Sequence, residues 1–464
     1  MVDPASYALF RRRALGLAPA SFALARAART GLARGELTTL READLFRRHA
    51  EAMEGYRAAL ARDEGRALAA TPPADARPAD ARPADARPAD ARPADARPAD
   101  ARPADEASLL DLKVELATRL LAPCRLCHLR CPVDRLAGET GRCGLGAGLR
   151  VYRDIVHLGE ELELVPTHTL WLAGCNWRCA YCSDWAHVDR PEADPEVGLE
   201  RVARSIEARR AEGARSLTFV GGLPDVNLPG IARVLALTRA SVPVVWNSNM
   251  SATPEAHDLL EGLVCAYVAD LKYGNERCAR AGSAVAGSLE AVHGNLRRVT
   301  TEAWLVVRHL VLPGHVDCCA LPALDWIAAH LPGARVNVMG QYEPVPEVRG
   351  TAWDRRVAPD EVARAREHAR ALGLDLDGPG ALPPPDVDVS SGGRPGSAVP
   401  ATVDGFESTI RIRADGHVVF EDLPPDLAAL AAELTGGADV DAAARRRAAA
   451  PWTPAEAPGD APGP

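Results

Sequence analysis

Apolar and polar residues alternate in blocks from Thr167 to about residue 375. Short apolar runs predict buried strands at Thr169–Ala173, Leu217–Val220, Val242–Trp246, Ala266–Leu271, Trp304–Leu312 and Arg335–Met339. Longer stretches with apolar residues at helical spacing predict helices over 197–212, 229–240, 254–262, 286–298, 320–331 and 359–372. Six such units predict an α/β fold whose parallel sheet either curls into a partial barrel or forms a doubly wound open sheet.

The segments before this region, which spans residues 161–375, have simpler patterns. Residues 1–68 have apolar positions at helical spacing and predict a helical region. Residues 69–106 repeat the pentapeptide Pro-Ala-Asp-Ala-Arg, whose regular prolines and small side chains predict a disordered linker. Residues 107–160 open with a short helix at 109–121 and then become rich in cysteine and glycine.

The segments after the barrel predict a linker and a small appendage. Gly, Pro, Ser and Asp dominate residues 376–405, which predicts a second linker. Residues 406–436 predict a β-hairpin that turns at Asp415-Gly416, followed by a Leu-rich helix at Leu427 to Leu434. Residues 437–464 are rich in Ala and Pro and predict a disordered tail.

Charge and hydropathy exclude two classes of protein. The chain has 464 residues and a net charge of −9, which argues against a protein that coats nucleic acid. It contains no run of eighteen apolar residues, so we expect no membrane span. Only Lys113 and Lys272 are lysines, although arginines are abundant, which makes each lysine a residue of interest.

Candidate chemistry concentrates in the loop after the first barrel strand. Residues 174–182 read GCNWRCAYC and place Cys175, Cys179 and Cys182 at CxxxCxxC spacing. Three closely spaced thiols in a non-secreted chain indicate a metal centre rather than disulfides. Iron–sulfur clusters usually have four thiolate ligands, so three suggest a 4Fe-4S cluster with one open iron. The alternatives are a zinc knuckle and redox-inert thiols. Eleven cysteines with such a motif fit a reducing cytoplasm.

The motif, with Tyr181 before its last cysteine, resembles that of the radical S-adenosylmethionine (SAM) enzymes. The stretches GRCGLG, DLKYG, VRHLVLPG and VNVMGQYEP extend the resemblance to the pyruvate formate-lyase activating enzyme-like branch over roughly residues 120 to 345. The resemblance implies the (βα)6 partial barrel rather than the open sheet. It also implies that the open iron chelates SAM and that the reduced cluster cleaves it to a 5′-deoxyadenosyl radical.

A second cysteine group precedes the motif. Cys124, Cys127, Cys131 and Cys143 surround glycine-rich turns and predict a compact metal-binding knuckle. Its spacing leaves open a structural zinc ion, an auxiliary iron–sulfur cluster and thiols without a metal. Relatives in the resembled branch carry a similar group, which supports its presence but does not identify its metal.

Polar residues and glycines at the strand ends are candidates for cofactor binding, as the resemblance implies. Asp270 suits an ammonium group, Lys272 and Arg308 suit a carboxylate, and Asn247 and Asn249 suit hydroxyl groups. The complete set of candidates is Tyr181, Gly221, Gly222, Asn247, Asn249, Asp270, Lys272 and Arg308. Leu223 stands where relatives have an acidic residue after the glycine pair. The alternative for each candidate is an ordinary strand-end residue or salt bridge, and no catalytic side chain is assigned.

The remaining cysteines lack a recognisable pattern. Cys265, Cys278, Cys318 and Cys319 show no ligand spacing, so we interpret them as core or surface thiols. His309 and His315 flank the Pro313-Gly314 turn and are interpreted as structural.

The sequence therefore predicts a cytoplasmic radical SAM enzyme. The resemblance suggests a protein substrate, such as a glycyl radical enzyme to be activated, and an electron donor that is a reductase or a flavodoxin- or ferredoxin-type protein. Neither nucleic acid nor membrane is an expected partner. The alternatives are a radical modifier of a peptide or small metabolite, and a non-catalytic iron–sulfur scaffold or electron carrier.

Overall fold

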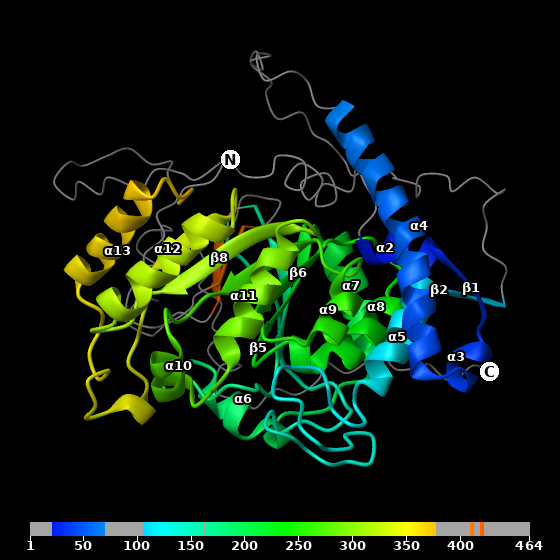
Figure 1. Ribbon diagram of the computed structural model, residues 1–464, viewed down its shortest axis with the longest axis horizontal. Helices are drawn as coiled ribbons and strands as arrows, with labels where there is room; N and C mark the ends of the chain where they lie inside the picture. Colours follow the sequence, from blue (N-terminus) through cyan, green and yellow to red (C-terminus); the bar gives the residue numbers. More distant parts are fainter. Residues whose placement is uncertain (1–20, 70–104, 162, 377–408, 413–417, 422–464) are drawn as a thin grey trace. The chain divides into compact units, whose positions relative to one another are not determined.

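The computed structural model describes residues 21–69, 105–161, 163–376, 409–412 and 418–421 (Figure 1). The chain divides into two compact units, residues 1–156 with 160–381 and residues 157–159 with 382–464. The repeat of Pro-Ala-Asp-Ala-Arg, the linker at 376–405, the helix at 427–434 and the tail at 437–464 lie essentially outside the described residues.

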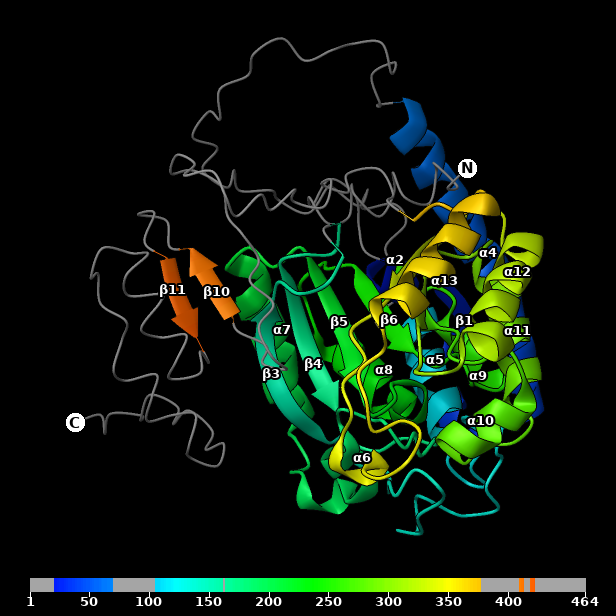
Figure 2. The same ribbon diagram turned by 90° about the vertical axis from the view of Figure 1, so that its left-hand side faces the viewer.

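The first unit is built around a seven-stranded sheet. Its strands are β3 (Val151–His157), β4 (Thr167–Leu172), β5 (Ser216–Gly221), β6 (Val244–Ser248), β7 (Ala266–Asp270), β8 (Trp304–Leu310) and β9 (Arg335–Met339). They follow one another in sequence order across the sheet, and β4 to β9 are parallel. Figure 2 shows β3 to β6 side by side. A doubly wound sheet reverses its strand order near the middle. The sequential order therefore confirms the partial barrel.

Both faces of the central strands are buried. Val244, Trp246 and Val307 belong to the large apolar core, whereas their neighbours Val245 and Val306 belong to a second, smaller cluster. Successive side chains of a strand point to opposite faces, so each face has its own apolar contacts. This double burial explains why the strands appear in the sequence as continuous apolar runs.

Helices connect the strands as the periodicity predicts. The predicted helices correspond to α7 (Leu199–Ala211), α8 (Leu228–Leu237), α9 (Pro254–Leu260), α11 (Ser288–Val299), α12 (Leu321–His330) and α13 (Pro359–Ala371). The structure adds α6 (Trp185–Asp189) and α10 (Glu276–Ser283), which the sequence did not indicate. Helix α10 is only eight residues long, starts at the capping side chain of Asn275 and stops where Ala284 adopts a positive φ of 48°.

The N-terminal part packs around one buried helix. Helix α5 (Leu109–Arg119) contacts α2 (Ser21–Ala27), α4 (Glu42–Ala69) and the barrel helices α8 and α9. Ser108 and Asp111 form a reciprocal capping box at its start. This region also contains α3 (Glu36–Thr39) and an antiparallel pair, β1 (Arg29–Ala33) with β2 (Glu106–Ser108), which the sequence did not indicate.

The second unit contains the predicted hairpin strands. β10 (Thr409–Ile412) and β11 (Val418–Glu421) pair antiparallel, with Thr409 opposite Glu421 and Ile412 opposite Val418. Within the described residues, none of the helices combines the length and apolar composition that crossing a bilayer requires.

One of the two lysines lies at the junction of the N-terminal helices and the barrel. Lys113 on α5 is fully buried, and its Nζ lies 2.7 Å from Nε2 of His49 and donates to the carbonyl of Asp258 at 3.3 Å. Burial lowers the pKa of Lys113 to about 7 from an ordinary 10.5. At neutral pH, burial of the charged ammonium group therefore costs folding free energy.

We predict that the stability of the fold rises with pH above 7 because of this lysine. Between about pH 7 and 10.5 the unfolded chain holds a proton on Lys113 that the folded chain lacks. Unfolding therefore takes up a proton, and it becomes less favourable as the pH rises. The slope from this one group is at most about 1.4 kcal/mol per pH unit. The free energy of unfolding of Lys113→Met, measured with urea across this pH range, should rise less steeply with pH than that of the wild type. An equal slope would contradict the prediction. Lys113→Arg, which cannot lose its charge, should be destabilised throughout.

Candidate metal centre

The CxxxCxxC cysteines lie on one loop at the carboxyl end of β4. Because β4 to β9 are parallel, this loop shares an end of the sheet with the residues that follow each other strand. Cys175 is buried, and Cys179 and Cys182 are half-buried. The loop thus lies where parallel barrels place their functional groups.

Helix α10 holds the middle of this loop. The backbone N–H groups of Arg178 and Ala180 donate to the carbonyls of Ser283 and Gly282, at 3.0 and 2.8 Å. The hydroxyl of Ser283 donates to Sγ of Cys179 at 2.9 Å. The carboxyl end of α10 therefore fixes both the loop backbone and one of its sulfurs.

A chain of hydroxyl groups ends on that sulfur. Tyr181 donates to Oη of Tyr273 at 2.9 Å, and Tyr273 lies 2.6 Å from Oγ of Ser283. Since Ser283 gives its proton to Cys179, it accepts from Tyr273. Tyr181 also packs against Trp353, with ring centroids 5.4 Å apart. The aromatic residue of the motif is thus oriented by contacts on both its ring and its hydroxyl.

Side-chain amides hold the start of the loop. Nδ2 of Asn176 donates to Oγ of Ser251 at 2.7 Å, and Nδ2 of Asn249 donates to Oδ1 of Asn176 at 3.1 Å. Oδ1 of Asn249 in turn accepts from the hydroxyl of Ser251 at 2.7 Å. Asn249, a candidate for cofactor binding, already has polar contacts with the motif loop. Asn247 in β6 is half-buried.

The thiols of the motif lie in an environment that keeps them protonated in the absence of a metal. Burial raises the pKa of Cys182 to about 12, and the neighbouring Cys179 adds to the effect. Burial likewise raises the pKa of Cys175 and of Cys179. The ammonium of Lys272 acts in the opposite direction on Cys179 and Cys182. One cation is therefore positioned to stabilise negative charge on these sulfurs.

Lys272 is paired within the chain. Its Nζ donates to Oδ2 of Asp270 at 2.8 Å. Burial alone would lower the pKa of Lys272, but Asp270 and Cys179 together hold it above its ordinary value. Lys272 therefore remains charged beside the loop.

Arg308 is paired as well. Its guanidinium contacts Glu160 and donates to both carboxylate oxygens of Glu161, at 3.0 and 2.7 Å. Burial opposes the charge on Arg308, but the two glutamates raise its pKa. Its charge is already met by two carboxylates, which any further acidic group would have to displace.

The glycine pair after β5 fits tightly against the motif loop. A Cβ on Gly222 would lie 2.2 Å from the carbonyl oxygen of Gly174, directly before Cys175. Gly221 has a φ of +92°, and a Cβ there would meet the backbone of Leu172 at 2.7 Å. These glycines are needed for backbone packing between β4 and β5.

Comparison with known proteins identifies the family. The radical SAM superfamily model matches residues 170–327. The uncharacterized protein MJ0674 of Methanocaldococcus jannaschii is 36% identical over 278 residues, which cover 58% of this chain and 80% of that protein. The chain belongs to the radical SAM superfamily. Membership confirms the expectation of a radical SAM enzyme whose cofactors are a 4Fe-4S cluster and SAM.

The solved structures are less similar to this radical SAM protein than the M. jannaschii protein is. SuiB of Streptococcus suis is 13% identical with a TM-score of 0.34, over 45% of this chain and 47% of SuiB. SuiB bound to SAM gives the same identity and TM-score over 44% of this chain. The chain thus spans about half the length of SuiB, and a likeness of this size carries no functional argument.

The second cysteine group lies against the radical SAM motif. Gly174 could not carry a Cβ, which would lie 2.8 Å from the carbonyl oxygen of Cys143. Arg178 donates through Nη2 to the carbonyl of Arg142 at 2.8 Å. Burial raises the pKa of Cys127 to about 12, and a contact with Asn176 lowers it only in part. Cys124, Cys127, Cys131 and Cys143 therefore belong to a segment adjacent to the motif, and metal binding by this group stays a prediction.

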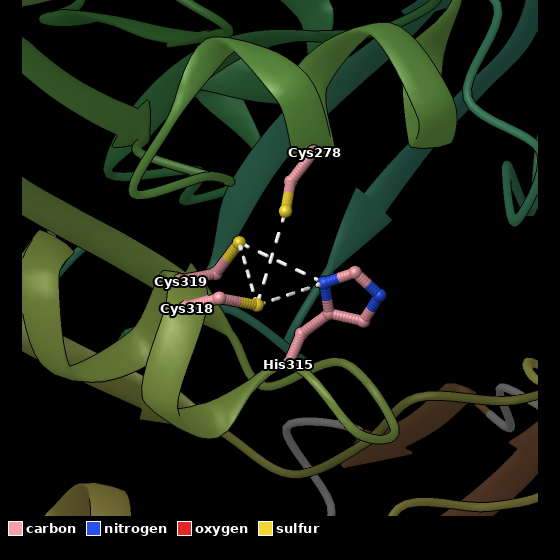
Figure 3. A group of neighbouring side chains, drawn as sticks. All are labelled: Cys278, His315, Cys318 and Cys319. Carbon is pink, nitrogen blue, oxygen red and sulfur yellow. Dashed lines mark hydrogen bonds between the residues drawn. The ribbon is translucent and has the colours of Figure 1, made fainter.

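Three further cysteines, interpreted as core or surface thiols, do belong to the core or pack against it, but their proximity to one another was not predicted. Cys278, Cys318 and Cys319 are separated in the sequence but converge on His315 in the folded chain (Figure 3). Sequence reasoning also missed Ser251 and Ser283, which lie in no motif, and Tyr273, which lies in the DLKYG stretch but was not singled out. Asn176 could have been found because it lies inside the cysteine motif.

The close contact between the two glycine-bearing loops gives a testable prediction. Gly222→Ala should destabilise the protein by about 1–3 kcal/mol because the new methyl group overlaps Gly174. Gly294→Ala is the matched control: Gly294 lies within α11 with nothing near its Cβ position, so alanine should stabilise by about 0.5–1 kcal/mol. Denaturant unfolding measures both. A Gly222→Ala protein as stable as the wild type would show that the loops separate easily.

Proposed function

We propose that Cys175, Cys179 and Cys182 bind the 4Fe-4S cluster. Three thiols on one loop suit this cluster because they leave one iron without a protein ligand, and a catalytic metal site keeps such an open position. The observation that carries the proposal is the support of this loop: Ser283 donates to Cys179, and Lys272 supplies a half-buried positive charge. Hydrogen bonds to sulfur and nearby charge are the means by which proteins adjust cluster potentials.

When bound, the cluster supplies the electron that cleaves SAM to methionine and a 5′-deoxyadenosyl radical. The residues that we propose to surround SAM stand in the last residues of the parallel strands or on the loops that follow them: Tyr181, Gly221, Gly222, Asn247, Asn249, Asp270, Lys272 and Arg308. Asp270 and Lys272 offer opposite charges to the ammonium and carboxylate of a methionine moiety. The ring of Tyr181 is buried beside the motif by its contacts with Tyr342 and Trp353.

The substrate that we propose is a protein, and the reaction is abstraction of a hydrogen atom from a glycine. This part rests on the resemblance of residues 120 to 345 to the activating enzyme-like branch. We propose a flavodoxin- or ferredoxin-type protein, or a reductase, as electron donor, a cytoplasmic location, and a second metal, zinc or iron–sulfur, at Cys124 to Cys143.

Cleavage of SAM is the first step to test. Protein reconstituted anaerobically with iron and sulfide should release 5′-deoxyadenosine when given reductant and SAM. Cys179→Ala should reduce the product to background, whereas Cys265→Ser, which changes a thiol outside the motif, should leave it close to the wild type. A fully loaded cluster without product would overturn the enzymatic proposal and favour the iron–sulfur scaffold.

Substrate class is tested with a labelled probe. Peptides in which both hydrogens on the glycine Cα are deuterium should transfer one deuterium to 5′-deoxyadenosine as the glycine becomes a Cα radical. Mass spectrometry would detect the transfer. Peptides with deuterium only in alanine methyl groups serve as the control. Unlabelled product with every peptide, although SAM is cleaved, would contradict a glycine substrate and favour a small metabolite.

A further inference from the structure

A group of four metal-ligating side chains lies outside the radical SAM motif. Cys278 comes from α10, His315 from the turn after β8, and Cys318 and Cys319 from the π-helical turn η4 (Val316–Ala320). Figure 3 shows the three sulfurs and the imidazole pointing toward one another. Their ligand atoms all lie within 4.8 Å of one another. Among the residues that the structure describes, no other group of three or more Cys, His, Asp or Glu side chains lies as close together.

The distances match a single tetrahedral ion. Zn–S bonds of about 2.3 Å and Zn–N bonds of about 2.0 Å at tetrahedral angles place sulfurs about 3.8 Å apart and sulfur about 3.5 Å from nitrogen. Sγ of Cys318 lies 3.8 Å from Sγ of Cys278, 3.9 Å from Sγ of Cys319 and 3.4 Å from Nδ1 of His315. Sγ of Cys319 lies 3.8 Å from the same nitrogen.

The backbone around the four side chains is built to bring them together. Asn275 accepts from the N–H of Cys278 at 2.9 Å and donates to the carbonyl of Cys318 at 2.6 Å, which links α10 to η4. Gly274 allows the closest approach, since a Cβ there would lie 2.8 Å from the carbonyl oxygen of Cys319. The π-helical turn presents adjacent cysteines to one centre, and such turns occur frequently at functional sites.

We propose that Cys278, His315, Cys318 and Cys319 bind one zinc ion as a Cys₃His site. Three thiolates and one imidazole are a common ligand set of structural zinc, and four protein ligands leave no open position. A 4Fe-4S cluster fits less well, because its ligand sulfurs bind separate irons and lie farther apart than those around one ion. The site is therefore distinct in chemistry from the motif at Cys175 to Cys182.

Zinc at this position would anchor the helix that supports the motif loop. Cys278 is near the start of α10, and Gly282 and Ser283 at its end hold Arg178, Ala180 and Cys179. The ion would fasten the start of α10 to η4. Its contribution is structural and does not depend on the identity of the substrate.

Zinc binding should also change the hydrogen bond between Trp353 and His315. Its Nε1–H donates to Nε2 of His315 at 3.0 Å, so without metal the ring proton is on Nδ1. Zinc on Nδ1 would move that proton to Nε2, where it would face another donor, and the bond from Trp353 would break. Binding should thus change the environment of Trp353, and Trp353→Phe should hold zinc at least as tightly as the wild type.

Zinc content is the direct test. Full-length protein grown and purified with zinc would be analysed by elemental mass spectrometry, with circular dichroism as the check on folding. Cys278→Ser and Cys318→Ser should each contain one zinc ion per chain fewer than the wild type, whereas Cys265→Ser, the cysteine outside all three groups, should match the wild type. Folded variants with the wild-type zinc content would overturn the proposal.

A measurement on the unmutated ligands covers the case in which those variants do not fold. Zinc added to the chelator-treated wild type should alter tryptophan fluorescence, and the change should be absent from Trp353→Phe, which should still bind one zinc ion here. Stoichiometric zinc binding without a fluorescence change in the wild type would overturn the site. Loss of this zinc ion from Trp353→Phe would also count against ligation through Nδ1.

Discussion

Two backbone hydrogen bonds connect the cysteine loop to the end of α10, and much of the site depends on them. They run from Arg178 to Ser283 and from Ala180 to Gly282. A loop that binds a metal has few internal hydrogen bonds, so its shape must be set by neighbours. Here the neighbour is a short polar helix with little apolar surface of its own, which therefore needs support at its other end.

Burial of the loop has an electrostatic cost that the surroundings offset. Apolar surroundings disfavour thiolates at Cys175, Cys179 and Cys182, as their raised pKa values indicate. Lys272 and the hydroxyl of Ser283 act in the opposite direction on Cys179. The use of lysine here agrees with its compact ammonium, since a guanidinium needs a wider set of partners. Asp270 keeps the ammonium in place.

The barrel was predictable because its strands and helices are long enough to show a period. All six predicted strands and six predicted helices are present, since burial on both sheet faces produces continuous apolar runs and helix burial produces a 3.6-residue period. Helix α10 is polar and short, and it was missed. The group around His315 was missed because its side chains come from two separate connections, with Cys278 and Cys318 40 residues apart. Spacing rules detect only ligands that are close in sequence.

The pairing of Arg308 has a consequence for how the barrel closes. Among the described strands, β3 and β9 are the edges of the sheet. Glu161 and Glu163, which directly precede β4, reach across to Arg308 in β8 and Arg335 in β9. The connection between β3 and β4 is thus joined to β8 and β9 by side-chain charge. Each of these carboxylates is buried with its arginine, so separating a pair would leave uncompensated charge in the interior, and the connection before β4 is thereby fixed to the far strands.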